Sequence, residues 1–247
     1  MQPREIIENI KLTHPNIQTL YFVGCGASSS ELYPAEYFMR ANAHKLRTGY
    51  FTANEFNYAT PAACDDTAIV IACSLGGNTP ETVAAAKLAR EKGAVVISIT
   101  HDAASPLAAN GDYVIVHGFE KNYAAKLEKM NNVMMLAVEV LNQYEGCELY
   151  EDMVNGYLHI YDAIENAVSY VLPSAKQFAE DYKNESIIYV MSSGATERVA
   201  YSTSICLLLE MQWVNSGFCN DGEFFHGPFE IVDKDVPYLL LMNDGRT

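Results

Sequence analysis

The sequence predicts an α/β protein in which mostly parallel sheets are covered by helices. Short apolar runs bounded by Gly, Ser and Asp alternate with longer stretches of helical character. A composition of 49% hydrophobic and 19% charged residues is typical of a folded protein rather than a fibrous or disordered one. The length of 247 residues suits one large domain, or one domain and part of a second.

The first half of the chain contains five expected strands, at residues 19–23, 49–52, 68–73, 94–100 and 113–117. Helices are expected between them at 32–42 and 80–92. The second of these helices has the best-marked ends, with Thr79 as N-cap, Pro80 at the first helical position and Gly93 just past the end.

The second half begins with a region that has no strand-like run, where we expect two or three helices at 123–144, 150–171 and 174–183. Strand character resumes at 186–191, 213–219 and 236–242, with a helix at 197–212. We therefore expect a first domain at 1–145, a helical bridge at 146–184 and a second domain at 185–247.

A weak internal repeat relates the two halves. Residues 21–28 can be laid over residues 189–196, and each is a buried strand followed by x-Gly-Ala-Ser/Thr and a helix. We interpret this as a duplicated α/β unit, with coincidence as the alternative. The second half offers fewer strands than the first, so we expect its domain to be incomplete at the C-terminal end.

The net charge of the chain disfavours two classes of binding partner. Lys and Arg number 16 against 31 Asp and Glu, and the net charge of −15 repels nucleic-acid backbones and anionic membranes. Neither a secretory signal nor a membrane-spanning run is recognisable. The six cysteines form no C-x-x-C pair, which indicates reduced thiols and a cytoplasmic protein without a zinc ribbon.

Two loops that follow expected strands have the composition of anion sites. Residues 74–79, Ser-Leu-Gly-Gly-Asn-Thr, combine hydroxyls, glycines and a helix N-terminus, so a phosphate or carboxylate fits there. An ordinary strand-to-helix turn capped by Thr79 is the alternative. Residues 24–30, Gly-Cys-Gly-Ala-Ser-Ser-Ser, have the same setting, and loops at the carboxyl ends of neighbouring strands would face one crevice.

The sequence matches three other functional loop motifs poorly. The third glycine of a dinucleotide-binding fingerprint is replaced by Ser29. The Gly-Lys-Ser/Thr of a Walker A loop and the Gly-x-Ser-x-Gly of a hydrolase elbow are both missing from the sequence.

Three segments together resemble the sugar isomerase (SIS) family, and within it the fructosamine-phosphate deglycases, relatives of the isomerase half of glucosamine-6-phosphate synthase. They are Gly-Cys-Gly-Ala-Ser at 24–28, the loop and helix start at 72–82, and Gly-Glu-Phe-Phe-His-Gly-Pro at 222–228. The resemblance implies tandem SIS domains, each a mostly parallel five-stranded sheet flanked by helices, in a homodimer or larger homo-oligomer. It implies a phosphorylated sugar-amine as substrate and no cofactor.

Carried over residue by residue, the resemblance places substrate binding on two sets of positions, which are Gly26, Ala27 and Ser28 in the first loop and Ser74, Gly76 and Thr79 in the second. Relatives commonly have serine where this chain has Gly76, which removes one hydroxyl donor.

Glu210 and His226 are the candidate catalytic pair. Glu210 closes an apolar helix, where we expect partial desolvation to raise its pKa toward that of a general base, although a solvent-facing Glu is the alternative. His226 lies in an aromatic segment, where a packed core histidine is the ordinary reading. The resemblance favours proton transfer for both and implies that His226 completes the site of a neighbouring subunit.

The chemistry suits such a pair. The ring of a 6-phosphorylated ketosamine must first open, and His226 suits that proton transfer. Glu210 would then transfer the C1 proton, which converts the substrate through an enaminol to an aldimine. Water finally hydrolyses the aldimine. Glu223 can bind sugar hydroxyls, orient His226 or cap a helix. The sequence has no metal-ligand spacing such as H-x-x-x-H. An aldose/ketose isomerase and a non-catalytic sugar-phosphate-binding chain are the competing hypotheses.

Overall fold

A computed structural model describes residues 1–119 and 123–242, which fold as two compact units, Met1–Ile164 and Glu165–Thr247. The first unit is built on one five-stranded sheet with the order β2-β1-β3-β4-β5, in which every pairing is parallel. Its strands are β1 (Thr19–Gly24), β2 (Arg47–Thr52), β3 (Ala68–Cys73), β4 (Val95–Thr100) and β5 (Tyr113–Val116). The five predicted strands are thus confirmed to within a few residues.

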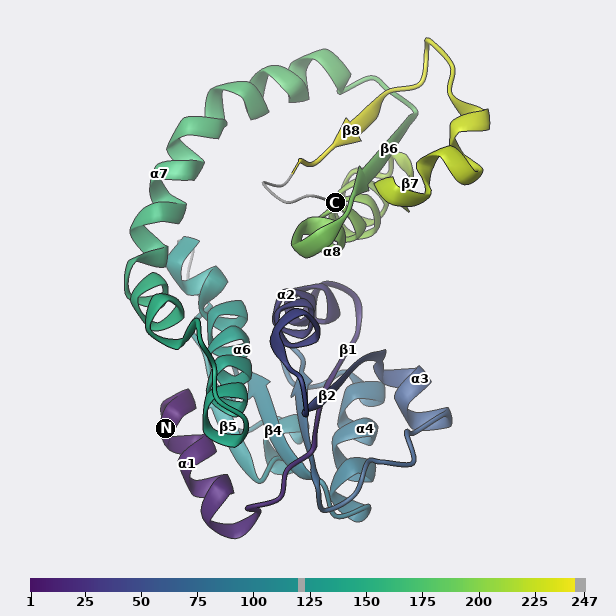
Figure 1. Ribbon diagram of the computed structural model, residues 1–247. Helices are drawn as coiled ribbons and strands as arrows, with labels where there is room; N and C mark the ends of the chain where they lie inside the picture. The colour runs from purple at the N-terminus through teal and green to yellow at the C-terminus, as the bar shows by residue number, and fades with distance from the viewer. Residues whose placement is uncertain (120–122, 243–247) are drawn as a thin grey trace. The chain divides into compact units, whose positions relative to one another are not determined.

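Helices cover both faces of this sheet (Figure 1). One face packs against α1 (Pro3–Thr13), α2 (Gly26–Asn42) and α6 (Tyr123–Tyr144), and the other against α3 (Ala53–Tyr58), α4 (Pro80–Glu91) and α5 (Pro106–Ala109). The three central strands β1, β3 and β4 are buried along their whole length, as parallel strands between two helical layers are expected to be. In β3, for example, Ile69 and Ile71 join one core while Val70 and Ala72 join the other.

Two helices differ from the sequence prediction. Helix α2 begins at Gly26, six residues earlier than expected (32 − 26 = 6), and Pro34 lies inside it. Helix α7 (Tyr150–Tyr182) is one continuous helix of 33 residues, whereas we had expected two helices interrupted at Pro173. An interior proline removes one backbone N–H donor and can bend a helix without ending it, so the prediction of a break at Pro173 was wrong.

The second unit holds a three-stranded parallel sheet with the order β7-β6-β8. Its strands are β6 (Ile187–Ser192), β7 (Asn215–Asn220) and β8 (Tyr238–Leu240). The remaining elements are η1 (Gly194–Thr196), α8 (Glu197–Ser202), η2 (Thr203–Gln212), η3 (Asp221–His226) and η4 (Pro228–Ile231). The helix expected at 197–212 is present, but its second part, η2, is a π-helix. The tandem-domain boundaries stay a prediction.

In the part of the chain that the structure describes, no helix combines the length and apolar character that crossing a bilayer requires.

One carboxylate joins the end of α6 to the start of β2 in the first unit. Glu145 accepts hydrogen bonds from three successive backbone N–H groups, those of His44, Lys45 (3.0 Å) and Leu46 (2.9 Å). Partial burial acts to raise the pKa of Glu145, but these three donors prevail and lower it below the ordinary carboxyl value.

We expect Glu145→Gln to lower the free energy of unfolding by about 1–2 kcal/mol, because an amide oxygen replaces a charged acceptor at a partly solvated site. Since the pKa of Glu145 is lowered in the folded chain, its contribution exists above the ordinary carboxyl pKa and is lost as the pH falls through the lowered value. Urea unfolding at neutral and acidic pH measures both effects. The exposed Glu148→Gln is the control, and equal destabilisation by the two variants would contradict the role of Glu145.

Candidate functional site

The two glycine-containing loops leave adjacent strands at the same edge of the first sheet. Strands β1 and β3 pair in parallel, with Gly24 opposite Cys73, so both loops start side by side. The first turn of α4 also contacts the first loop, where the Thr82 hydroxyl donates to the Cys25 sulfur at 3.8 Å. The predicted neighbourhood of the two loops is therefore confirmed.

In the second loop, 74–79, the two hydroxyl groups contact each other and do not cap α4, the helix that follows. Ser74 Oγ and Thr79 Oγ1 lie 2.9 Å apart. Thr79 occupies the N-cap position of α4 but makes no side-chain cap hydrogen bond, whereas Ser105 at the start of α5 accepts one from the N–H of Ala108. The alternative in which Thr79 serves only as a cap thus fails, and the first N–H groups of α4 have no side-chain acceptor from the N-cap.

The first loop, 24–30, shows the same arrangement at the start of α2. Its N-cap, Cys25, makes no side-chain cap hydrogen bond, and Gly26 has a positive φ of 54°. The three serines differ in their partners. Ser29 Oγ lies 2.5 Å from the Tyr50 hydroxyl and Ser30 donates to the Gly26 carbonyl, which leaves Ser28 as the serine with a different role.

Ser28 contacts a residue that the sequence did not point to. Lys129, on α6, donates from Nζ to Ser28 Oγ at 3.3 Å and forms an ion pair with Glu31. The side chain of this lysine is only 5% exposed. A signal in the sequence existed, because Lys129 interrupts the helix face that packs on the sheet, but one lysine in a long helix is ordinarily solvent-facing.

The six substrate-binding positions predicted in the two loops lie at this edge of the sheet, whereas Glu223, the seventh candidate, lies in the second unit. Ser74 is buried, Ser28, Gly76 and Thr79 are half-buried, and Gly26 and Ala27 are exposed. These positions, which we call the cradle, bring backbone N–H groups and hydroxyls together around two helix N-termini, and such an arrangement is chemically suited to an anion.

The candidate catalytic residues lie in the second unit, on elements that precede and follow β7. Glu210 is near the end of η2 and is exposed, so the expected desolvation of its carboxylate is wrong for the chain described. Of the ten residues of η2, only Ser204 is buried. Trp213, which ends η2, has a positive φ of 59°.

His226 and Glu223 share the short helix η3, and both are exposed. The reading of His226 as a packed core histidine is therefore excluded for this unit. Asn220 is the N-cap of η3, where its side chain accepts from the N–H of Gly222, so Glu223 is not the N-cap of this helix.

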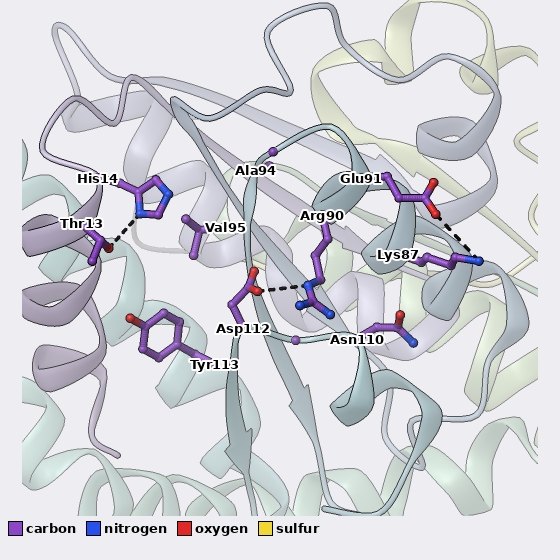
Figure 2. A pocket seen from close by; sticks show the side chains of 12 residues that line it. Thr13, His14, Lys87, Arg90, Glu91, Ala94, Val95, Asn110, Asp112 and Tyr113 are labelled. Atoms are coloured by element: carbon purple, nitrogen blue, oxygen red, sulfur yellow. Dashed lines mark hydrogen bonds and ion pairs between the residues drawn. The ribbon is translucent and has the colours of Figure 1, made fainter.

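A cavity of about 800 Å³ lies at the opposite edge of the first sheet, beside the starts of β4 and β5 (Figure 2). Four of its charged side chains form ion pairs with one another. Arg90 pairs with Asp112 at 3.0 Å and Lys87 with Glu91 at 3.8 Å. Asp112 also accepts from the N–H of Val96. These four charged side chains are thus paired with one another, and we do not propose a function for the cavity.

The structure describes residues 1–119 and 123–242. No group of three or more His, Cys, Asp or Glu side chains within these ranges is arranged to hold a metal ion.

The two glycines of the second loop provide a matched test of its geometry. Gly77 has a φ of 66°, and a Cβ there would lie 2.1 Å from Ser105 Oγ and 2.8 Å from Thr100 Oγ1. At Gly76 a Cβ would meet only the side-chain nitrogen of Asn78, at 3.7 Å. We expect Gly77→Ala to cost about 1–3 kcal/mol of folding free energy and Gly76→Ala to leave it within about 0.5 kcal/mol. Equal thermal unfolding midpoints for the two variants would show that the loop is not held as described.

Comparison with known proteins places the chain in a family. The SIS domain model matches residues 15–141, which is the part that contains both loops. Fructosamine deglycase FrlB of Bacillus subtilis is 39% identical over 94% of this chain and 70% of its own length. Fructoselysine 6-phosphate deglycase of Escherichia coli K12 is 26% identical over 94% of this chain and 67% of its own.

Solved structures agree with the sequence comparison. The crystal structure of a protein assigned as a phosphosugar isomerase from Salmonella typhimurium is 41% identical, with a TM-score of 0.95 over 99% of this chain and 74% of that one. The C-terminal domain of glucosamine-fructose-6-phosphate aminotransferase from Francisella tularensis, at 16% identity and a TM-score of 0.76, shares the fold. The chain belongs to the SIS domain family and is related over most of its length to enzymes of that family.

Proposed function

We propose that the chain is a deglycase that cleaves 6-phosphofructosyl-amines to glucose 6-phosphate and a free amine. Support comes from the relatives named for deglycation of fructosamines and of fructoselysine 6-phosphate, which match 94% of the chain.

The observation that carries this proposal is the pair of adjacent loops in front of two helices without side-chain caps. A phosphate bound there would receive N–H groups from α2 and α4, and the hydroxyls of Ser28, Ser74 and Thr79 would add donors. The negative charge would also complement two helix dipoles.

The proposed reaction needs an acid and a base and no redox chemistry. His226 would move the proton that opens the hemiketal ring of the substrate. Glu210 would remove the C1 proton to give an enaminol and return it at C2, and the resulting aldimine between C1 and the amine nitrogen would be hydrolysed by water. Glu223, beside His226 on η3, would contact sugar hydroxyls or orient the imidazole.

We further propose tandem SIS domains and a homodimer in which His226 completes the site of the other subunit. The second unit repeats a feature of the first, because Gly194 after β6 has a φ of 60° where Gly26 after β1 has 54°. Donation of His226 across a dimer also fits its exposure within one chain.

An aldose/ketose phosphosugar isomerase is the alternative, because related structures carry that assignment. Product analysis separates the two, since a deglycase releases an amine from fructoselysine 6-phosphate, whereas an isomerase would instead convert fructose 6-phosphate to an aldose phosphate.

The catalytic pair is tested by two variants and their mixture. Glu210→Gln and His226→Ala should each reduce release of glucose 6-phosphate from fructoselysine 6-phosphate by about 100-fold or more, as expected for loss of a general acid or base. If His226 acts across the dimer, equal mixing of the two variant chains after subunit exchange should restore about one quarter of wild-type activity, because half the dimers then hold one intact site. Wild-type release by either variant would refute the mechanism, and a mixture as inactive as its parts would refute the shared site.

Gly76 offers a gain-of-function test of the phosphate cradle. A serine there meets open space near Asn78 and restores the hydroxyl that relatives commonly have. We expect Gly76→Ser to lower KM for fructoselysine 6-phosphate about three- to tenfold through one added hydrogen bond, while Gly76→Ala does not. Equal KM values for the two variants would show that no phosphate oxygen lies near this position.

A further inference from the structure

We infer that Lys129 is a positioning residue for the sugar-phosphate site, which fixes the Ser28 hydroxyl from behind so that its proton faces the bound phosphate. This inference rests on the proposed function, since it assigns a part to a residue of the same site. It concerns a side chain that lies outside the substrate-binding positions found from the sequence.

The contacts of Lys129 place its ammonium group directly behind the first loop. Its Nζ donates to Ser28 Oγ at 3.3 Å and is ion-paired with Glu31, and both partners are on α2. The Lys129 side chain is 5% exposed, while Glu31 remains 32% exposed. The Lys129 ammonium group on α6 thus lies beside the start of α2 and is buried from solvent.

The direction of the hydrogen bond determines what Ser28 can do. An ammonium group has donors and no acceptor, so Ser28 Oγ must accept from Lys129. The hydroxyl proton of Ser28 is then available to another acceptor. The nearby competitor is the sulfur of Cys73, a weak acceptor, and a phosphate oxygen at the cradle would be a much stronger one.

The energetics of Lys129 argue against a purely structural role. Burial lowers its pKa to about 8, although the Glu31 carboxylate favours the protonated form. A lysine whose pKa is lower in the folded chain than in the unfolded one reduces folding stability at neutral pH, and that reduction disappears as the pH rises. The fold therefore keeps a charge that costs it stability, which is common where the charge serves a ligand.

The other titratable groups near this cluster are the carboxylates of Glu31 on α2 and Glu128 on α6 and the thiol of Cys73 on β3, whose pKa burial raises to about 12. Burial lowers the pKa of His117, at the end of β5, so its imidazole is neutral between pH 7 and 9. The phosphate ester of glucose 6-phosphate completes its second ionisation near pH 6.

The test measures binding of glucose 6-phosphate to the full chain by calorimetry between pH 7 and 9. For the wild-type chain we expect Kd to rise about tenfold over this range as Lys129 loses its proton. Lys129→Met should weaken binding about tenfold or more at pH 7 and remove the pH dependence. Lys129→Arg should restore binding at pH 7 and hold it to pH 9, because a guanidinium stays protonated.

Lys87→Met is the matched control, because it removes one exposed lysine from α4 at the far edge of the sheet. It should change neither Kd nor its pH dependence. Lys129→Met leaves Glu31 without its partner, so the double variant Lys129→Met/Glu31→Gln is measured in parallel, and it should bind as weakly as the single variant while unfolding at or above the wild-type temperature.

Three results would overturn the inference: a folded Lys129→Met or double variant with Kd within twofold of wild type, an unchanged pH dependence in Lys129→Arg, or a wild-type chain that does not bind glucose 6-phosphate. The proposed reaction is judged separately by release of glucose 6-phosphate from fructoselysine 6-phosphate. A wild-type chain that binds glucose 6-phosphate without that release contradicts the reaction, and Lys129 is then judged from Kd alone.

Discussion

The parallel pairing of β1 with β3 is the constraint on which the candidate site depends. With Gly24 opposite Cys73, the chain leaves both strands at one edge, and each strand is followed directly by a loop and a helix. A shift of this pairing by one residue would exchange the two faces of β3 between the separate cores that hold Ile69 and Val70. The packing of the sheet therefore fixes the geometry of the loops.

The loops themselves sacrifice stability for a surface that can receive an anion. Helices α2 and α4 begin without side-chain caps, and a good N-cap contributes about 1 kcal/mol. Gly77 holds a left-handed conformation against Ser105, and Lys129 is charged in a buried position. Helices α3 and α5, which follow other strands of the same sheet, are capped by Thr52 and Ser105. Within one sheet, the capped N-termini of α3 and α5 therefore support the fold, whereas the uncapped N-termini of α2 and α4 are available to a ligand.

The sequence predicted the parallel sheet, the extent of α6 and the position of both loops, because periodicity, glycines and strand ends are local signals. It missed features that depend on contacts between distant residues or on small differences in helix geometry. Pro173 does not interrupt α7, and Glu210 is exposed on the π-helical η2 although an apolar run precedes it in the sequence. Lys129 reaches Ser28 across 101 residues of sequence, a separation over which no pattern in the chain predicts a contact.

The central claim is that the two loops recognise a phosphate carried by a sugar-amine. Calorimetric titration of the Glu210→Gln chain with fructoselysine 6-phosphate and with unphosphorylated fructoselysine tests it most directly, because turnover does not interfere. We expect the phosphorylated compound to bind at least about 30-fold more tightly, as several charge-assisted hydrogen bonds to one phosphate would provide. Equal affinity for the two compounds would contradict the claim.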